Sequence, residues 1–565
     1  MSYFLEQSSG LLFQLQHIGK VKALCQHELF AHVDDSTVEA LLETAASFSE
    51  EKLQPLAALG DIEGCKLVDG NVKLPTGTAS VFAEWCDLGF PTLGLPIEID
   101  GLGLPAVVQS AVQEICDGAN VAFGMMAINL RCAALALLKN ATPAQQARWI
   151  AGLTKGSITS TIVISEPQAG SDVGRITTAA HPQPDGSYAL TGSKIWISYA
   201  DHDLTEEILH LVLARIPGSE PGSRGLSLFA VPKTTSVQVL RLEHKMGLHA
   251  SPTCVVEFQQ ARGELIGEAG RGLQALFVMM NGMRLAVAVQ GAAVANAAAL
   301  QAFAYASERP QGGHPLAPAI PIIQHADVQR MLLEMTADGE LARALALRTA
   351  ALLDNAAATA STDDAASLHS LQMAELILPI AKTWNAETAF AVASQGIQVL
   401  GGYGYTSDYP LERMARDIRV AAIYEGTSGI QSLDFVKRKV LGDGATTLRR
   451  LLDVAAADLA SGDSPFVARW QTVRELLDSR VDSLLNLPKE SIRNAEAGAY
   501  ALLQLTALAL HCWNGHTLFV SASEPHPHQQ RLRAALGYFA GSVTAKAALW
   551  STRSAQELPA FSYAK

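Results

Sequence analysis

One carboxylate in this chain stands where it could remove a proton from carbon. Glu425 follows the largely apolar run 420–424 and precedes Gly426 and Thr427. Burial next to apolar residues disfavours the charged carboxylate and raises its pKa. A carboxylate whose pKa lies closer to the working pH is a better general base. A Glu before Gly is more often a solvated turn residue, however, so the hypothesis depends on other segments of the chain.

Two other segments combine turn residues with strand-like or glycine-rich sequence. In residues 165–172, Pro167 favours an extended residue before it, Gly170 can take a positive φ, and Ser171 offers a hydroxyl in a turn. Residues 194–198, Lys-Ile-Trp-Ile-Ser, then alternate like a strand. In residues 398–405, adjacent glycines would let the backbone approach a pyrophosphate closely, although such a motif alone more often marks a tight turn.

In this order, the three segments resemble the acyl-CoA dehydrogenase family of flavoproteins over roughly residues 40–440. Further matches resemble the longer bacterial branch with an extra C-terminal domain, which includes 3-methylmercaptopropionyl-CoA dehydrogenases and broad-range fatty acyl-CoA dehydrogenases. These matches lie at residues 201–206, 243–247, 251–254, 279–284 and 309–312. The resemblance implies FAD as cofactor and dehydrogenation of an acyl-CoA thioester to a trans-2-enoyl-CoA.

The family assigns the base to the Glu of this motif, so the resemblance implies that Glu425 removes the proton next to the thioester carbonyl. A hydride then leaves the neighbouring carbon for flavin N5, and electrons pass to electron-transferring flavoprotein. The backbone N–H of Glu425 would help to stabilise the thioester oxygen, as donors do in an oxyanion hole.

The resemblance also implies which residues bind the cofactor and the substrate. The expected FAD contacts are Ile164, Ser165, Gly170, Ser171, Trp196, Ser198, Arg309, Gln311, Gln398, Gly401, Gly402 and Thr427. The expected substrate contacts are Ser171, Asn281, Arg284, Tyr424 and Gly426. Alternatives stay open for three of them: Trp196 as a core aromatic, Arg309 in a surface salt bridge, and Arg284 as a buried partner of a carboxylate. Gly429 departs from the Glu or Gln found there in many relatives, so one flavin contact is in doubt.

Composition narrows the class of protein. The chain has 565 residues, of which 49% are hydrophobic and 17% charged, as expected for a core-rich globular protein of several domains. A net charge of −13 without a dense basic run argues against nucleic acid or an anionic membrane as the main partner. Seven scattered cysteines and an N-terminus without a signal-peptide pattern predict a cytoplasmic protein with reduced thiols and no metal site.

The pattern along the chain predicts an α+β fold of the acyl-CoA dehydrogenase type. We expect a helical domain at 1–155, a β-barrel domain at 156–269 with short strands and frequent turns, a helical bundle carrying Glu425 at 270–442, and an extra helical domain at 443–565. Residues 285–307 carry no charge but are rich in alanine, which favours a buried bundle helix over a membrane span. The small, polar stretch 354–367 predicts a connection between helices.

Two other functions remain as hypotheses. An acyl-CoA oxidase would give its electrons to oxygen, and the sequence hardly separates it from a dehydrogenase. A flavin-bearing nucleic-acid-binding relative would need a basic C-terminal face, whereas residues 443–565 contain nearly equal numbers of basic and acidic residues. Flavin contacts from Arg309 and Gln311 across subunits would require at least a homodimer, and a dimer of dimers is also possible.

Overall fold

The computed structural model describes residues 3–488, 492–522 and 527–559, and the chain forms two compact units. The helical unit comprises Met1–Ala46, Pro105–Gly118 and Arg284–Lys565, and the sheet unit comprises Ser47–Leu104 and Ala119–Met283. The order along the chain is helical, then β, then helical with further C-terminal helices, as predicted. The predicted four-part division within this order stays a prediction.

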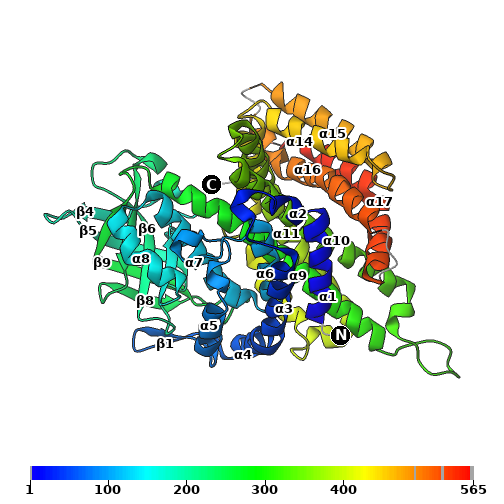
Figure 1. The fold of residues 1–565 in the computed structure, drawn as a ribbon, viewed down its shortest axis with the longest axis horizontal. Coiled ribbons are helices and arrows are strands. Elements are labelled where there is room, and N and C mark those ends of the chain that lie inside the picture. The colour runs from blue at the N-terminus through cyan, green and yellow to red at the C-terminus, as the bar shows by residue number, and fades with distance from the viewer. Residues whose placement is uncertain (1–2, 489–491, 523–526, 560–565) are drawn as a thin grey trace. The chain divides into compact units, whose positions relative to one another are not determined.

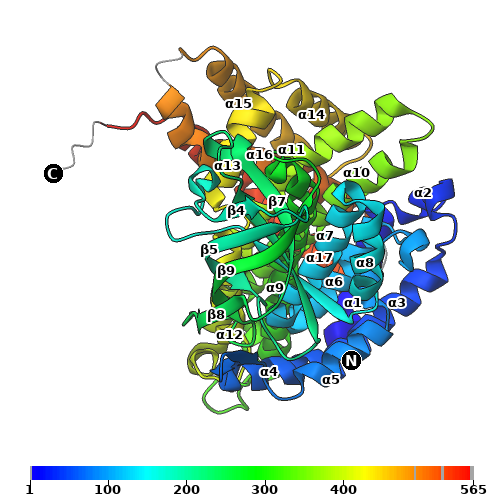
Figure 2. The ribbon, with the colours of Figure 1, turned by 90° about the vertical axis from the view of Figure 1, so that its left-hand side faces the viewer.

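Seven strands of the sheet unit form the central sheet. They are β3 (Ile158–Val163), β4 (Ala179–Pro182), β5 (Tyr188–Ser198), β6 (Glu207–Arg215), β7 (Leu226–Pro232), β8 (Val237–Leu242) and β9 (Thr253–Ile266). Their order is β3-β6-β4-β5-β9-β7, and β8 pairs with β9. Figure 2 shows β4, β5, β9 and β8 side by side. Because β6 also pairs with β7, the strands β6, β4, β5, β9 and β7 close a ring, which makes the predicted barrel.

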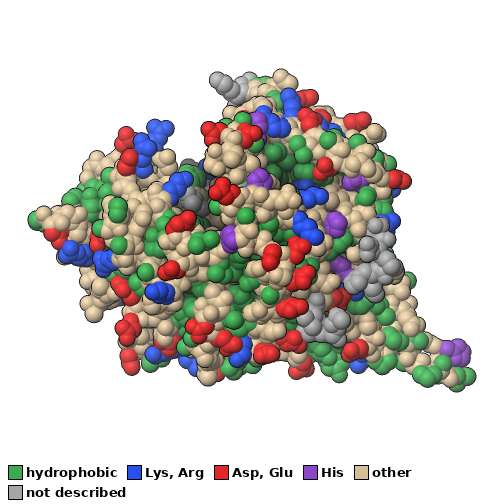
Figure 3. Space-filling model, in the orientation of Figure 1, with side chains coloured by type: hydrophobic (Ala, Val, Ile, Leu, Met, Phe, Trp, Pro, Cys, Tyr) green, Lys and Arg blue, Asp and Glu red, His purple; other side chains and the backbone are tan. Residues whose placement is uncertain are grey.

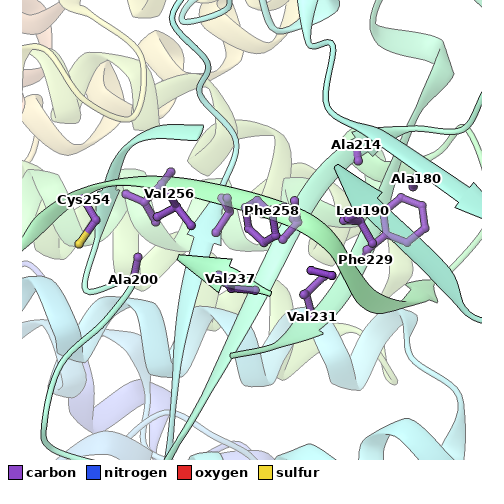
Figure 4. Close-up of a cluster of buried hydrophobic side chains, with 14 of the residues drawn as sticks. Ala180, Leu190, Ala200, Ala214, Phe229, Val231, Val237, Cys254, Val256 and Phe258 are labelled. Atoms are coloured by element: carbon purple, nitrogen blue, oxygen red, sulfur yellow. The ribbon is translucent and has the colours of Figure 1, made fainter. Parts of the chain in front are cut away.

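The core of this barrel is a cluster of small and aromatic side chains (Figure 4). Phe229 and Phe258 lie among valines and alanines from several strands, and all of these side chains are buried. Outside the sheet, the unit contains the hairpin β1 (Lys66–Val68) and β2 (Asn71–Lys73) with α4 (Gln54–Glu63), α5 (Thr78–Asp87), α7 (Val121–Asn140) and α8 (Pro143–Thr154). Helix α8 starts with a capping box, in which Thr142 and Gln145 exchange side-chain and backbone hydrogen bonds.

Long helices make up the helical unit. They include α1 (Tyr3–His17), α6 (Ala106–Ala119), α10 (Ala326–Thr359) and α11 (Asp364–Leu400), and most of α9 (Gly272–Glu308) belongs to it as well. Small residues let α9 approach its neighbours closely: a Cβ on Gly291 would lie 2.6 Å from the Asn385 backbone, and one on Gly339 would lie 2.6 Å from Asn296 Oδ1. Substitutions at either glycine would force these helices apart.

The extra C-terminal helices are α14 (Thr446–Leu459), α15 (Val467–Leu485), α16 (Ile492–Ser521) and α17 (Pro527–Ser554). Figure 1 shows them in yellow to red beside α10 and α11, with which they pack. Polar contacts secure this packing: the Arg348 guanidinium on α10 lies 3.5 Å from the Trp513 ring centroid and donates to Asn514 Oδ1 at 2.5 Å.

Among the described residues, two helices, α7 and α9, are long and apolar enough to cross a membrane. However, 78% and 65% of their most apolar segments are buried within the protein. Both are therefore core helices, which confirms the prediction for residues 285–307.

The connection predicted over residues 354–367 is shorter than expected. Helix α10 continues to Thr359 and α11 begins at Asp364. Asp354 lies within α10, where its carboxylate accepts hydrogen bonds from the backbone N–H groups of Ala106 and Val107 at 2.6 and 3.0 Å. A polar residue that suggested a loop is thus a buried cap for the first turn of α6.

Candidate active site

Glu425 lies on a tight turn between two short helices of the helical unit. The turn follows the 3₁₀ helix Arg419–Ala422 and precedes α13 (Ser428–Asp434). Glu425 has a φ of 53° and Gly426 a φ of 89°, so both are left-handed. A left-handed non-glycine residue costs about 1–2 kcal/mol and persists only where its surroundings enforce it.

Three side chains hold this turn. Gln431 Nε2 donates to the carbonyl of Glu425 at 2.7 Å, and Lys382 Nζ on α11 donates to the carbonyl of Gly426 at 2.6 Å. Thr427 Oγ1 accepts from Ile430 N at 3.2 Å and caps α13. The carbonyls of two consecutive residues are therefore fixed by side chains from different helices, which explains how the strained conformation is maintained.

The charges around Glu425 set its protonation. Burial among protein atoms raises its pKa, while the positive charges of Lys382 and Arg284 oppose that rise without cancelling it. Arg284 is itself held by Asp434 at 3.0 Å, and Arg438 also pairs with Asp434. Of the two earlier interpretations of Arg284, the structure therefore contains the buried ion pair.

Tyr424, next to the carboxylate, is anchored to the bundle. Its hydroxyl donates to Gln290 Oε1 on α9 at 2.5 Å, and burial raises its pKa. Gly426 is also sterically restricted, since a Cβ there would lie 2.9 Å from Gln431 Nε2. These two neighbours of Glu425 therefore support the turn from either side.

A second group of predicted residues lies at the C-terminal end of α11 and on the segment after α9. Gln398, Gly401 and Gly402 are exposed, and the Gln398 carbonyl accepts from Gly401 N. The Arg309 guanidinium lies 5.5 Å from the ring centroid of Tyr403, beside these glycines. Gln311 follows on an exposed segment, where its carbonyl contacts His325 Nε2 at 2.8 Å. The helical unit thus brings Arg309 close to the glycine-rich turn.

The remaining cofactor residues form a group within the sheet unit. Ile164 and Ser165 follow β3, and their carbonyls accept from Lys194 Nζ at 2.8 Å and from Ile195 N at 3.0 Å. Lys194 also pairs with the buried carboxylate of Glu166 at 2.9 Å. Burial acts to raise the pKa of Glu166, but Lys194 and hydrogen bonds from Thr178 and Thr177 outweigh it and hold the pKa at about 2.

Trp196 has an unusual conformation beside this loop. Its φ is 62°, at a register shift between β5 and β9, and 58% of the residue is exposed. The earlier alternative, a core aromatic, is therefore wrong. Ser198 ends β5 two residues further on, and Asn281 is a half-buried residue of α9. A strained, exposed tryptophan is typical of a ligand-binding position.

Both units have room where a cofactor would contact them. A Cβ added at Gly170, Gly401 or Gly402 would meet no atom within 4 Å. In the sheet unit, the exposed Ser171 hydroxyl is a donor and the exposed Trp196 ring a planar surface suited to an aromatic cofactor. In the helical unit, the exposed Arg309 guanidinium is a donor suited to a phosphate. The residues present therefore fit a flavin nucleotide.

Sequence reasoning missed the residues that hold the Glu425 turn. Lys382 had one signal, a single charge after the apolar run 376–381. Gln431 had no such signal, because it contacts the backbone of Glu425 across a turn. Gln290 had none either, because it contacts Tyr424, which is distant in the sequence. At Gly429, a Cβ would meet only Thr427 Oγ1, at 3.7 Å, so the structure has space for a Cβ at this position.

Comparisons with known proteins match most of this chain. Family models for the N-terminal, middle and C-terminal domains of acyl-CoA dehydrogenase match residues 35–157, 161–261 and 270–440. The 3-methylmercaptopropionyl-CoA dehydrogenase of Ruegeria pomeroyi is 38% identical over 89% of this chain and 88% of its own length. The broad-specificity linear acyl-CoA dehydrogenase FadE5 of Mycobacterium tuberculosis is 33% identical over 84% of this chain and 81% of its own.

A solved structure, that of an acyl-CoA dehydrogenase from Bacillus anthracis complexed with FAD, shares the fold. It superposes with a TM-score of 0.77 at 20% identity and covers 94% of this chain and 90% of its own. The chain belongs to the acyl-CoA dehydrogenase family.

Proposed function

We propose that this protein oxidises an acyl-CoA thioester to the trans-2-enoyl-CoA with Glu425 as the base. The carboxylate of Glu425 takes the proton from C2 of the acyl chain, while two electrons and the hydrogen of C3 leave as hydride. The observation that carries this proposal is the left-handed turn at Glu425, which two side chains clamp and in which burial raises the pKa of the carboxylate. Such a carboxylate suits a general base near neutral pH.

Bound FAD would supply the hydride acceptor at its N5. In the sheet unit, Ile164, Ser165, Gly170, Ser171, Trp196 and Ser198 would hold the flavin ring. In the helical unit, the nucleotide would be held by Gln398, Gly401, Gly402 and Thr427. A pyrophosphate would be contacted by Arg309 and Gln311, and in a homodimer this pyrophosphate would belong to the FAD of the partner subunit. None of these residues is buried, their glycines leave open space, and the FAD complex of the Bacillus anthracis enzyme shares the fold; these observations support the assignment.

The substrate contacts differ in how directly they would act. Gly426 and the backbone N–H of Glu425 would border the thioester, and Ser171 and Asn281 would line the acyl-CoA from the sheet unit. Arg284 and Tyr424 would act indirectly, because Arg284 is paired with Asp434 and Tyr424 is bonded to Gln290. Arg284 would then contribute mainly its positive charge near the base.

The activity is tested with purified, FAD-loaded protein under anaerobic conditions. The panel contains acyl-CoAs with linear chains and 3-methylmercaptopropionyl-CoA, because the named relatives act on these classes. We expect at least one member of the panel to bleach the flavin absorbance. A reduced enzyme that transfers electrons to electron-transferring flavoprotein and reacts slowly with oxygen is a dehydrogenase. Fast reoxidation by oxygen would assign it as an oxidase, and a panel without bleaching would contradict the proposal.

Nucleic acid is not part of the proposal. On the face drawn in Figure 3, the described residues mix acidic and basic side chains without a continuous basic surface. The net charge of −13 would repel a polyanion, and the described residues of this face offer no continuous basic surface that would offset that repulsion.

The role of Trp196 can be separated from its effect on folding. Asparagine tolerates a left-handed φ, so Trp196→Asn should change the free energy of unfolding of the FAD-free protein by no more than about 0.5 kcal/mol. FAD affinity should fall about tenfold, since stacking on an aromatic ring is worth roughly 1–3 kcal/mol. Flavin fluorescence titration measures the affinity, and unchanged FAD binding would remove Trp196 from the proposed site. Leu240→Asn, at another exposed apolar position of the same unit, serves as the control.

A further inference from the structure

Lys382 is a buried cation in the middle of α11. Its side chain is fully buried, directly after the apolar run 376–381. Fully buried lysines are rare, because removing an ammonium from water is costly unless a partner compensates. Here the ammonium donates to the carbonyl of Gly426, at 2.6 Å. This contact places a positive charge at the backbone of Gly426, the residue that follows the proposed base, Glu425.

The other charged groups near this position are already engaged in defined contacts. Arg284 on α9 is paired with Asp434, which also binds Arg438. Glu387, five residues along α11 from Lys382, accepts from the Ser428 hydroxyl at 2.7 Å. The charges that act on Lys382 are those of Glu425, Arg284 and Glu387, and those that act on Glu425 are Lys382 and Arg284. Lys382 is therefore the cation that couples the turn and the carboxylate.

We propose that Lys382 is a positioning residue for the reaction: its ammonium holds the left-handed turn through the Gly426 carbonyl and places near Glu425 a positive charge that favours the ionised carboxylate. The inference rests on the proposed role of Glu425 as base. Two requirements conflict at Glu425, since burial strengthens it as a base but disfavours its ionised form, the form that accepts a proton. A fixed positive charge nearby limits this rise in pKa.

The direction of the pH effect follows from this balance. Flavin reduction requires ionised Glu425, so its rate falls as the pH drops through the pKa of Glu425. Removing the charge of Lys382 raises that pKa further, because an opposite charge nearby favours the ionised carboxylate. Burial lowers the pKa of Lys382 to about 8, so the ammonium is mostly charged below that pH. The acidic limb of the pH profile should therefore move to higher pH without it.

The experiment compares three replacements of Lys382 in the FAD-loaded, full-length enzyme. Lys382→Met removes both charge and donor, Lys382→Gln keeps a donor without the charge, and Lys382→Arg keeps both. The rate of anaerobic flavin reduction by a saturating acyl-CoA is measured from pH 5 to 9. We expect the acidic limb to move up by about one pH unit in the Met and Gln variants, and to stay in place in Arg. Below the limb, this shift lowers the rate about tenfold.

The control is Lys439→Met, which removes an ammonium from the same unit where it pairs with Glu375 at 2.7 Å. It should leave the acidic limb in place. If the acidic limb stays in place in both Lys382→Met and Lys382→Gln, the inference is overturned. Loss of folded protein in both variants would also overturn it. Either result assigns Lys382 a purely structural role. The proposed function has its own test: if Glu425→Gln reduces flavin at the wild-type rate, the base is wrong, whatever Lys382 does.

Discussion

Glu425→Gln will keep FAD bound and lower the rate of flavin reduction by acyl-CoA by about 10²- to 10⁴-fold, the range that a positioned general base contributes. Glutamine has almost the same shape, and the bonds that hold the turn end on backbone carbonyls, so the turn should persist. The amide cannot accept the C2 proton. Stopped-flow absorbance of the flavin measures the rate, and the yellow colour of the purified variant reports bound FAD.

The same variant should unfold at equal or higher temperature than the wild type at pH 7. Because burial raises the pKa of Glu425 in the folded state, its ionised form costs stability above that pKa. The cost disappears as the pH falls below the unfolded value of about 4.3. Glutamine removes it, so the gain should be present at pH 7 and absent near pH 4.

Glu412→Gln is the matched control for both measurements. Glu412 lies on α12 (Leu411–Ile418), where it forms a half-buried pair with Arg416 at 2.7 Å. The same carboxylate-to-amide change there should leave the reduction rate within a few-fold. An equal loss of rate in both variants would mean that charge removal in this region disturbs the unit in general.

The sequence allowed the position of Glu425 to be predicted but not the way in which it is held. The apolar run and the following glycine are adjacent in the chain, so their effect on the carboxylate is a local property. The clamp depends on Lys382, which comes from another helix, and on Gln431, which reaches back across the turn. Only folding brings them together, and no periodicity of 2 or 3.6 residues encodes such contacts.

Trp196 shows the same limit within a strand. The alternation of residues 194–198 predicts a regular strand, and β5 does cover these residues. Its register shifts between Lys194 and Ile197, and Trp196 takes a φ of 62° there. Pattern reasoning assigns each residue the average conformation of its element. Strained exceptions, which tend to occur at binding sites, therefore escape it.

The second large effect is expected at the core of the helical unit, where Arg343 on α10 joins two buried carboxylates. Its guanidinium contacts Glu114 on α6 at 2.6 Å and Glu340 at 2.9 Å, and all three residues are buried. Gln14 on α1 donates to Glu340 at 2.6 Å, and His528 on α17 contacts it at 3.1 Å. The buried Arg343–Glu340 pair therefore connects the first helix, the bundle and the extra C-terminal helices.

Arg343→Met should destabilise the folded protein by about 3–5 kcal/mol at pH 7, because removing one partner leaves buried charges uncompensated. Urea unfolding followed by circular dichroism measures the loss. Arg330→Met is the control on the same helix: its partners Asp327 and Glu334 are partly exposed, so the expected cost is no more than about 1 kcal/mol. Equal destabilisation by both variants would contradict a special role for the buried cluster.

The pH dependence of this loss separates charge from packing. Burial acts to raise the pKa of Glu340, but Arg343 and His528 outweigh it and depress the pKa in the wild type. This depressed pKa contributes stability that is complete above the unfolded value of about 4.3 and is lost as the pH falls. Without Arg343, the buried carboxylates take up protons at higher pH and become neutral. The difference between wild type and Arg343→Met should therefore shrink as the pH is lowered from 7 to about 4.5, whereas a cost due only to the missing volume of the side chain would stay constant.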